Sequence, residues 1–387
     1  MVLFLLVQIS LALPYFCLEP NSKVFDTAEE NNLVFETKKR TCFVREVSQT
    51  EQAVFIESLM GNGWTNVQNL VQPEIIESKI QKNIDKETDI EHFKSNSYYN
   101  QVANCSEYRF VTSIIKNIGH EIDHVLRAGI SLPKEQEQKL GEELIPKIGE
   151  ALNGTIVRSG DTHKYLQGLV NQLEKNSTRD SIKYNVILIT GTEIENAFAT
   201  PGGFIYVTEA LLNNWVQSET QLLFVLGHEL AHVELHHTTA LAEYYTMLGQ
   251  SKNIITELVH AIISRPYSSV HEKQSDELVL HWMLYMGYSP YPVVDMWYNQ
   301  VVKPQSEPST NNASTAGLFS AMLDVGLTVV DTVADEAINV IETHPNPGAR
   351  ACFIHGEANK LLQTIPELSS DILVVGKTKI EKNLVLK

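Results

Sequence analysis

The second half of the chain carries the clearest hydrophobic patterns. Apolar residues recur at helical spacing over residues 133–152 and again around 165–173, which predicts two helices. Apolar and polar positions then alternate over 184–190, a pattern typical of a strand, and residues 204–208 predict a second strand. We expect these strands to form a small antiparallel sheet with an exposed edge. Such an edge can accept an extended peptide as an added strand.

Another helix is predicted to begin near Ser218. The run Ser218-Glu-Thr-Gln221 fits a capping box, in which two side chains satisfy backbone N–H groups at the start of a helix. Apolar residues follow at helical spacing, and the pattern continues towards Gly249. The apolar positions are Leu222, Leu223, Leu226, Leu230 and Val233.

This helix contains the sequence His228-Glu229-Leu-Ala-His232. Residues four apart lie on one face of a helix, so both imidazoles can bind one metal ion. Zinc with three protein ligands lowers the pKa of a water molecule to about 7, and a neighbouring carboxylate can take its proton. The motif therefore predicts a zinc hydrolase with His228 and His232 as ligands and Glu229 as general base.

A second match to the same pattern is His120-Glu121-Ile-Asp123-His124. Asp123 places a charge between the two histidines, where a buried zinc helix normally has uncharged residues. The sequence that follows has no obvious helix carrying a third ligand. We therefore interpret His120 and His124 as part of a solvated helix face.

The third zinc ligand is expected to be Glu272, at the start of a helix that follows residue 270. Glu234, Glu243 and Glu257 are the alternatives. Asp276 lies one turn after Glu272 on the same face, where it can orient a ligand or pair with a cation.

A metzincin site is excluded by two positions. It would need Gly at 235 and His at 238, where the chain has Leu235 and Thr238. His236 and His237 continue the predicted helix and are expected to be solvated or to support the ligands. The site should therefore hold one zinc ion through two histidines and one glutamate.

Several separate motifs resemble those of metallopeptidase family 48, the group that contains HtpX, the Oma-type proteases and the CAAX prenyl protease. The segment 196–208 is similar to the family's NAFA-x-PGG strand. The segment 272–290 follows the family's E-x-x-A-D-x-x-G helix and ends in Met286-Gly-Tyr-Ser-Pro290. Thr343-His344-Pro345 with Arg350 matches T-H-P-x-x-x-x-R. With the zinc helix, the resemblance covers residues 131 to 357.

The resemblance implies further roles. His344 would be a second catalytic residue, which contacts the substrate carbonyl or stabilises the oxyanion. Arg350 would steady the site through Asp276. The NAFA-x-PGG strand would lie beside the bound substrate, so substrate-binding residues are expected at Asn196, Ala197, Phe198, Gly202 and Gly203.

The chain departs from the family pattern at three positions. Ser269 stands where many members have Arg, Ser275 where the family usually has Ala, and Val279 where it has Gly. None of the three is a predicted ligand or the general base. The departures therefore concern packing and substrate preference rather than the chemistry.

Composition narrows the class of partner. The 387 residues are 43% hydrophobic, enough to bury a sizeable core. The formal net charge of -17 argues against nucleic acid or an anionic membrane surface as the main partner. We expect a protein or peptide substrate; the sequence gives no oligomeric state.

The first eighteen residues form an apolar run that is typical of a signal peptide. An uncleaved anchor and a buried N-terminal strand or helix are the alternatives. No other stretch is long and uncharged enough to cross a bilayer. We therefore expect the enzyme to act outside the cytoplasm, as a periplasmic or secreted protein. In this it resembles the soluble, extracytoplasmic branch of the family.

Four regions are predicted. A signal peptide or anchor (1–18) precedes a polar accessory segment with weak helical periodicity (19–110), the metallopeptidase domain (111–360) and a C-terminal tail (361–387). Within the domain, the composition of residues 302–316 predicts a loop, and an amphipathic helix is predicted to follow it. That helix is interpreted as core; a lid over the cleft is the alternative.

The fold is thus expected to be α+β and mainly α, a zincin of the gluzincin type with a small antiparallel sheet beside the zinc helix. The predicted activity is that of a zinc-dependent endopeptidase in extracytoplasmic protein quality control. The alternative is a non-proteolytic chaperone or assembly factor on a zincin scaffold. The intact Glu229 argues against this alternative, because a binding protein has no need of a general base.

Overall fold

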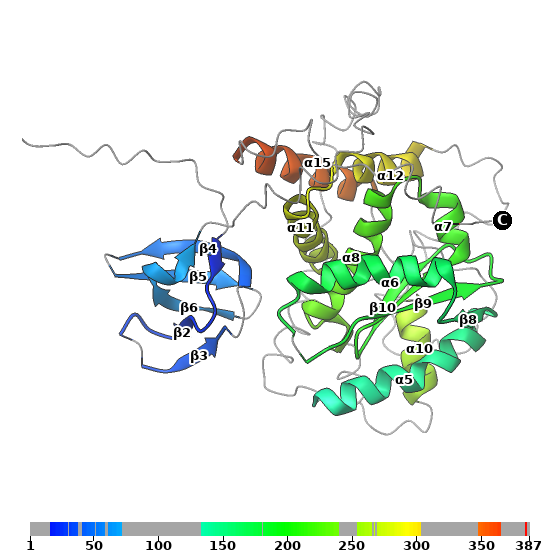
Figure 1. Ribbon diagram of the computed structural model, residues 1–387, viewed down its shortest axis with the longest axis horizontal. Helices are drawn as coiled ribbons and strands as arrows, with labels where there is room; N and C mark the ends of the chain where they lie inside the picture. The colour runs from blue at the N-terminus through cyan, green and yellow to red at the C-terminus, as the bar shows by residue number, and fades with distance from the viewer. Residues whose placement is uncertain are drawn as a thin grey trace, which may run out of the picture.

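The computed structural model describes residues 16–29, 31–37, 41–50, 52–58, 61–71, 133–179, 181–239, 254–264, 267, 269–302, 347–364 and 384. They form an N-terminal β-sheet and a larger α+β domain (Figure 1). Some predictions fall outside these residues. They concern the His120–His124 match, the alternative ligand Glu243, and residues 303–346 with most of the loop, the amphipathic helix and His344.

The N-terminal sheet has seven short strands in the order β3-β2-β6-β5-β4-β1-β7, and all their pairings are antiparallel. Its small core contains Val54 and Ile56, which lie two residues apart and so face the same side of β5. The strands are β1 (Phe16–Leu18), β2 (Lys23–Phe25), β3 (Leu33–Glu36), β4 (Thr41–Gln49), β5 (Ala53–Ser58), β6 (Gly61–Asn66) and β7 (Leu70–Val71).

The weak helical periodicity inferred for residues 19–110 is wrong for residues 19–71. The buried apolar side chains described in these strands are few, namely Leu18, Val24, Val54 and Ile56, so the period of two is hard to see among the polar residues. The clearest signal was the apolar run Ala53-Val-Phe-Ile56, which begins strand β5. Residues 72–110 lie outside the described part of the chain.

Strand β1 ends at the predicted boundary at residue 18 and so lies within the segment predicted as signal peptide or anchor. It pairs with β4 on one side and β7 on the other, and the side chain of Leu18 is fully buried. A cut after residue 18 would therefore remove a strand from the interior of this sheet.

The larger domain is built around a second sheet of four strands in the order β10-β11-β9-β8 (Figure 1). The expected small sheet is present, and its β10–β11 and β8–β9 pairs are antiparallel. The antiparallel arrangement expected for the two predicted strands, β9 and β11, is wrong: this pair is parallel, because the chain passes into β10 and turns back before β11 lies beside β9. The strands are β8 (Thr155–Val157), β9 (Asn185–Thr190), β10 (Ala197–Thr200) and β11 (Phe204–Thr208).

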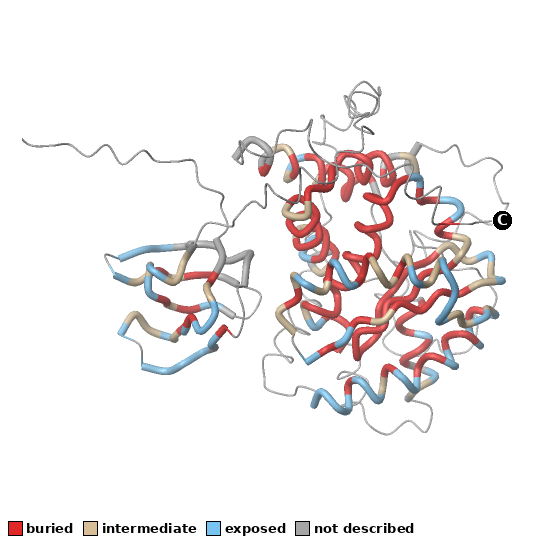
Figure 2. Tube along the Cα trace, in the orientation of Figure 1, coloured by how far each residue is buried: buried red, intermediate tan, exposed pale blue. Residues whose placement is uncertain are grey.

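Helices cover both faces of this sheet, and alternate residues of each strand therefore enter different cores (Figure 2). In β9, Val186 and Leu188 join the core made with α6, α8, α11, α12 and α15, whereas Ile187 and Ile189 join the core made with α5 and α10. The helices are α5 (Lys134–Ala151), α6 (Asp161–Leu173), α7 (Glu209–Trp215), α8 (Glu219–Glu234), α10 (Ile254–Ser264), α11 (Ser269–Tyr285), α12 (Tyr291–Val302) and α15 (Pro347–Thr364).

Helix α8 is the central helix of the domain, and all of its residues are buried. The Ser218 side chain caps its first turn by accepting a hydrogen bond from the Gln221 N–H, as the capping box predicted. Glu219 accepts hydrogen bonds from the hydroxyls of Tyr165 (2.6 Å) and Tyr288 (2.8 Å). These contacts tie the start of α8 to α6 and to the turn after α11.

The prediction that this helix runs towards Gly249 is wrong, because α8 ends at Glu234. His236 adopts a left-handed conformation with φ of 62°, which a continuous helix cannot contain. The Glu234 carboxylate accepts hydrogen bonds from the Ser177 hydroxyl (2.6 Å), the Thr178 N–H (2.6 Å) and the Tyr184 hydroxyl (3.0 Å). This network fixes the end of α8 and occupies Glu234, which was an alternative third ligand.

Helix α15 crosses a predicted boundary. It runs to Thr364, and Leu361 is buried in the core, so the domain continues beyond residue 360. Among the helices of the described residues, none is both long and apolar enough to span a membrane.

Candidate active site

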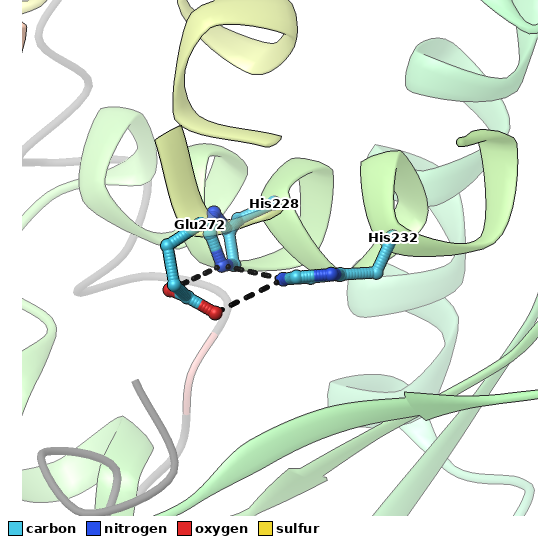
Figure 3. Close-up of side chains that lie close together, drawn as sticks. All are labelled: His228, His232 and Glu272. Carbon is cyan, nitrogen blue, oxygen red and sulfur yellow. Dashed lines mark hydrogen bonds and ion pairs between the residues drawn. The ribbon is translucent and has the colours of Figure 1, made fainter. Parts of the chain in front are cut away.

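Three side chains with metal-binding atoms converge at the junction of α8 and α11 (Figure 3). His228 and His232 point their Nε2 atoms towards each other at 3.0 Å. The Glu272 carboxylate lies opposite, with Oε2 3.3 Å from His228 Nε2 and Oε1 3.4 Å from His232 Nε2. All three residues are buried. Two imidazole nitrogens and a carboxylate at this spacing are a donor set that suits zinc.

Local sequence and close packing explain this convergence. The two histidines are four residues apart on α8, and Glu272 lies in the first turn of α11, which packs against α8. Gly227 lies where the two helices meet, and a Cβ at this position would overlap the Cγ2 atom of Val279. A small residue on α8 therefore makes room for a branched one on α11, at the position where the chain departs from the family's Gly.

Asp276 supports the site from the other side of the His228 ring. Its Oδ1 lies 2.9 Å from His228 Nδ1, so the carboxylate can fix which ring nitrogen faces Glu272. Arg350 donates from Nε (2.8 Å) and Nη2 (2.5 Å) to the two oxygens of Asp276. Its Nη1 lies 3.1 Å from Glu272 Oε2. The family resemblance implied that Arg350 acts through Asp276, and the structure brings these two residues together.

The Arg350 guanidinium is fully buried and lies over the ring of Trp297, 3.9 Å from its centroid. Burial by itself lowers the pKa of Arg350, but the charges of Asp276 and Glu272 outweigh it and raise the pKa. Arg350 therefore stays charged, and it partly neutralises two carboxylates that would otherwise repel each other.

The electrostatics of His228 follow from the same neighbours. Burial and the Arg350 charge lower the pKa of His228, whereas Glu272 and Asp276 raise it, and the net result is a pKa of about 9. Without a metal ion, this imidazole is held in its protonated form by the carboxylates. The carboxylates thus stabilise a positive charge at this place, and a bound cation would supply that charge.

His237 contacts the second histidine ligand, which the sequence did not predict in detail. Its Nδ1 lies 2.9 Å from His232 Nδ1, and its Nε2 lies 3.2 Å from Gln274 Oε1. Burial and the neighbouring His271 and His232 lower the pKa of His237 well below its usual range, so it is neutral at pH 7. His237 is buried, so the expectation that it is solvated is wrong. The other expectation was that it supports a metal ligand, and its contact with His232 agrees with that.

His237 could not be identified from helical spacing, because a turn and not a helix brings it next to His232. His237 lies five positions after His232, so the two would not share a face of a continuous helix. The left-handed residue His236 ends the helix and turns the chain back. Tyr267 covers the other side, with its ring stacked on His232 at a centroid distance of 3.8 Å.

Glu229 follows His228 on α8 and is also buried. The negative charge of Glu229 affects the pKa of two groups that the charge of Glu272 also affects. Burial is the main cause of the raised pKa of Tyr267, and the charges of Glu229 and Glu272 raise it further. Both carboxylates also contribute to the raised pKa of Arg350. The general base predicted from the motif therefore belongs to the same electrostatic cluster as the ligands.

The predicted substrate strand is β10, at one edge of the four-stranded sheet and in contact with α8. Its residues are buried, and Phe198 stacks on Tyr206 at 4.8 Å. Gly202 and Gly203 form the turn into β11 with φ of 84° and 83°, a conformation that favours glycine. The Gly202 N–H donates to Glu137 of α5 at 3.1 Å. The turn thus has a structural reason for both glycines, and their part in binding substrate remains a prediction.

Of the predicted site residues, the structure brings together His228, His232, Glu272, Asp276 and Arg350, with Glu229 beside them. Asn196 is buried at the start of the substrate strand, where its backbone exchanges hydrogen bonds with Thr208. The placement of His344 lies outside the described residues.

Comparison with known families agrees with this arrangement. The model of peptidase family M48 matches residues 161–358, from the start of α6 into α15. The match includes both histidines, Glu229, Glu272, Asp276 and Arg350. A comparison with curated proteins found no match.

Proposed function

The chain belongs to peptidase family M48, and on this premise we propose that this metallopeptidase is a zinc-dependent endopeptidase. The observation that carries the proposal is the convergence of His228, His232 and Glu272 with Glu229 next to them on α8. A structural metal site uses four protein ligands as a rule, whereas a catalytic site uses three and leaves one position open.

His228, His232 and Glu272 would hold the zinc ion. When bound, zinc supplies a Lewis acid that polarises the scissile carbonyl and acidifies water. Asp276 fixes the orientation of the His228 ring, and His237 does the same for His232 through Nδ1. Arg350 holds Asp276 and Glu272 in place together.

Glu229 would act as the general base. Its carboxylate takes a proton from the attacking water and passes it to the leaving amine. We propose that His344 assists by donating to the oxyanion, as the family motif implies. An extended substrate chain would pair along the β10 edge of the sheet, which presents a peptide bond in the required extended form.

We also propose that the enzyme works outside the cytoplasm, in protein quality control, as a periplasmic or secreted protein or one held to the membrane by an uncleaved N-terminus. Two features support the location: the apolar run of the first eighteen residues and a disulfide bond at Cys352. Fractionation of cells that produce the full chain, with N-terminal sequencing of the product, tests the location.

The activity is tested by cleavage of reduced casein with the purified, zinc-loaded chain and with Glu229→Gln as the matched control. The variant keeps the size of the side chain but cannot accept the proton, so we expect cleavage to fall by at least about a hundredfold while zinc content stays the same. Peptide products identified by mass spectrometry separate internal from terminal cleavage.

Equal cleavage by the two proteins would remove Glu229 from the mechanism. Zinc binding by both proteins without cleavage by either would favour the alternative of a chaperone or assembly factor on the same scaffold.

A further inference from the structure

A second group of metal-binding side chains lies between α11 and α15. Glu277 and His281 come from α11 and Glu357 from α15, and their ligand atoms all lie within 4.8 Å of one another. His281 is buried with 3% of its surface exposed, while the two glutamates are partly exposed. None of the three takes part in the site around His228.

The two groups occupy different positions along the contact between these helices. Asp276 and Glu277 are consecutive, so their side chains leave α11 in directions about 100° apart. On α15, Arg350 and Glu357 are seven residues apart, which is two turns or about 10 Å along the axis. Arg350 contacts Asp276, and Glu357 meets Glu277 and His281 farther along.

The chemistry of this second group suits a divalent ion. An imidazole and two carboxylates are each good ligands for zinc and related transition ions. Two carboxylates balance the double charge of the ion. Their partial exposure gives the ion a path from solvent and leaves room for water to complete its coordination.

Contacts beside the group also join α11 to α15. Glu277 and His281 are four residues apart on α11, the spacing that places two ligands on one helix face. One turn earlier on the same helix, the Lys273 ammonium lies over the Phe353 ring of α15, 5.1 Å from its centroid. Lys273 therefore contacts the helix that also carries Glu357.

We propose that Glu277, His281 and Glu357 form a second divalent-cation site, with zinc as its natural occupant. The ion ties α11 to α15. Because α11 carries Glu272 and Asp276 and α15 carries Arg350, this cross-link holds together the two helices whose ion pairs orient His228. This role is a cross-link between the helices and departs from the four-ligand rule for structural sites, because water completes the coordination. It does not depend on whether the first site cleaves peptides.

The test is the number of zinc ions retained by the folded chain after equilibrium dialysis against a small excess of zinc. We expect two per chain in the wild type and one in Glu357→Gln or Glu277→Gln, each of which keeps the side-chain volume. We expect one in the His228→Ala/His232→Ala double variant, and none when that double variant also carries Glu357→Gln. Glu142→Gln, an exposed glutamate on α5, is the control and should keep both ions.

A second measurement uses the double variant His228→Ala/His232→Ala, in which the first site is removed. Added zinc should raise its thermal unfolding temperature, because an ion that binds only the folded chain stabilises it. The rise should disappear when Glu357→Gln is added. A folded double variant that retains no zinc and gains no stability from it would overturn the proposal, and so would a zinc count in the wild type that Glu357→Gln and Glu277→Gln leave unchanged.

Loss of an ion in Glu142→Gln as well would show adventitious surface binding and would also overturn the proposal. The outcomes separate the two sites. If the first site fails, the wild type loses the ion that depends on His228 and His232 but keeps the one that depends on Glu357.

Discussion

At the scale of single residues, the site is held together by shared partners. Asp276 accepts from Arg350 and contacts His228, and Arg350 also reaches Glu272. His228 and Glu272 are therefore oriented through the same Asp276–Arg350 pair, whereas His232 is oriented separately by His237. Such supporting contacts commonly change metal affinity by about ten- to a hundredfold when they are removed.

Arg350→Lys tests this arrangement. Lysine keeps the charge but lacks the planar fork that reaches Asp276 and Glu272 together. We expect zinc affinity to fall by about ten- to a hundredfold, measured by competition with a zinc-binding dye. The exposed Arg158→Lys serves as control. Unchanged affinity in a folded Arg350→Lys protein would mean that Arg350 does not position the ligands.

At the scale of elements, the site depends on how closely α8 and α11 approach. Gly227 directly precedes His228, and because it has no side chain, Val279 of α11 can pack against the backbone of α8 at this point. In Gly227→Ala the new methyl group overlaps Val279, so we expect the free energy of unfolding to fall by about 1–3 kcal/mol. Chemical denaturation measures this loss.

Val279→Ala removes the Cγ2 atom that the new methyl group would overlap. It is therefore the second variant of a double-mutant cycle with Gly227→Ala. The double variant Gly227→Ala/Val279→Ala should be more stable than the sum of the two single effects predicts. Simple additivity in this double-mutant cycle would show that the two helices do not meet in the way described here.

Helix α12 contains a buried carboxylate with a pH-dependent effect on stability. Burial raises the pKa of Asp295 to about 7, above its ordinary value of 3.8. The folded state therefore binds the proton more tightly, and stability is lost as the pH rises from about 4 to 7. Below pH 4 both states are protonated and the effect disappears.

Asp295→Asn keeps the shape of the neutral form and removes the charge. We expect it to raise the free energy of unfolding at pH 8 by about 1–2 kcal/mol, less than the full pKa shift because water and relaxation screen the charge. The gain should shrink towards pH 4. Denaturation of both proteins across this range measures it, and a gain independent of pH would contradict the assignment.

At the scale of the whole molecule, the N-terminal sheet includes residues that the sequence assigned to the signal peptide or anchor. Strand β1 lies between β4 and β7, and Leu18 is fully buried. A chain that starts at residue 14 should keep this sheet, whereas one that starts at 20 should lose β1. The loss of Leu18 alone would cost about 2 kcal/mol.

Limited proteolysis of the two proteins measures the difference. We expect faster cleavage within residues 20–71 of the shorter protein, while the larger domain is cut at the same rate in both. Equal protection of the sheet would show that β1 is dispensable and would support cleavage at residue 18.

The sequence alone determined the features that depend on local spacing. His228 and His232 lie four residues apart on a helix, so the helix brings their imidazoles together whatever packs around it. The helices at 133–152 and 165–173 and the strands at 184–190 and 204–208 were also predictable, because each buries apolar residues at its own period. Glu272, Asp276 and Arg350 were identified from motifs, and the family match covers them.

The tertiary structure decided what depends on contacts between distant segments. The parallel pairing of β9 with β11, the left-handed turn at His236 that brings His237 to His232, and the meeting of Glu357 with Glu277 and His281 have no local pattern. Each arises because packed elements bring together residues whose own neighbours in sequence carry no sign of the partner. Spacing along a helix can place two ligands, but only packing between helices can add the third ligand and its supports.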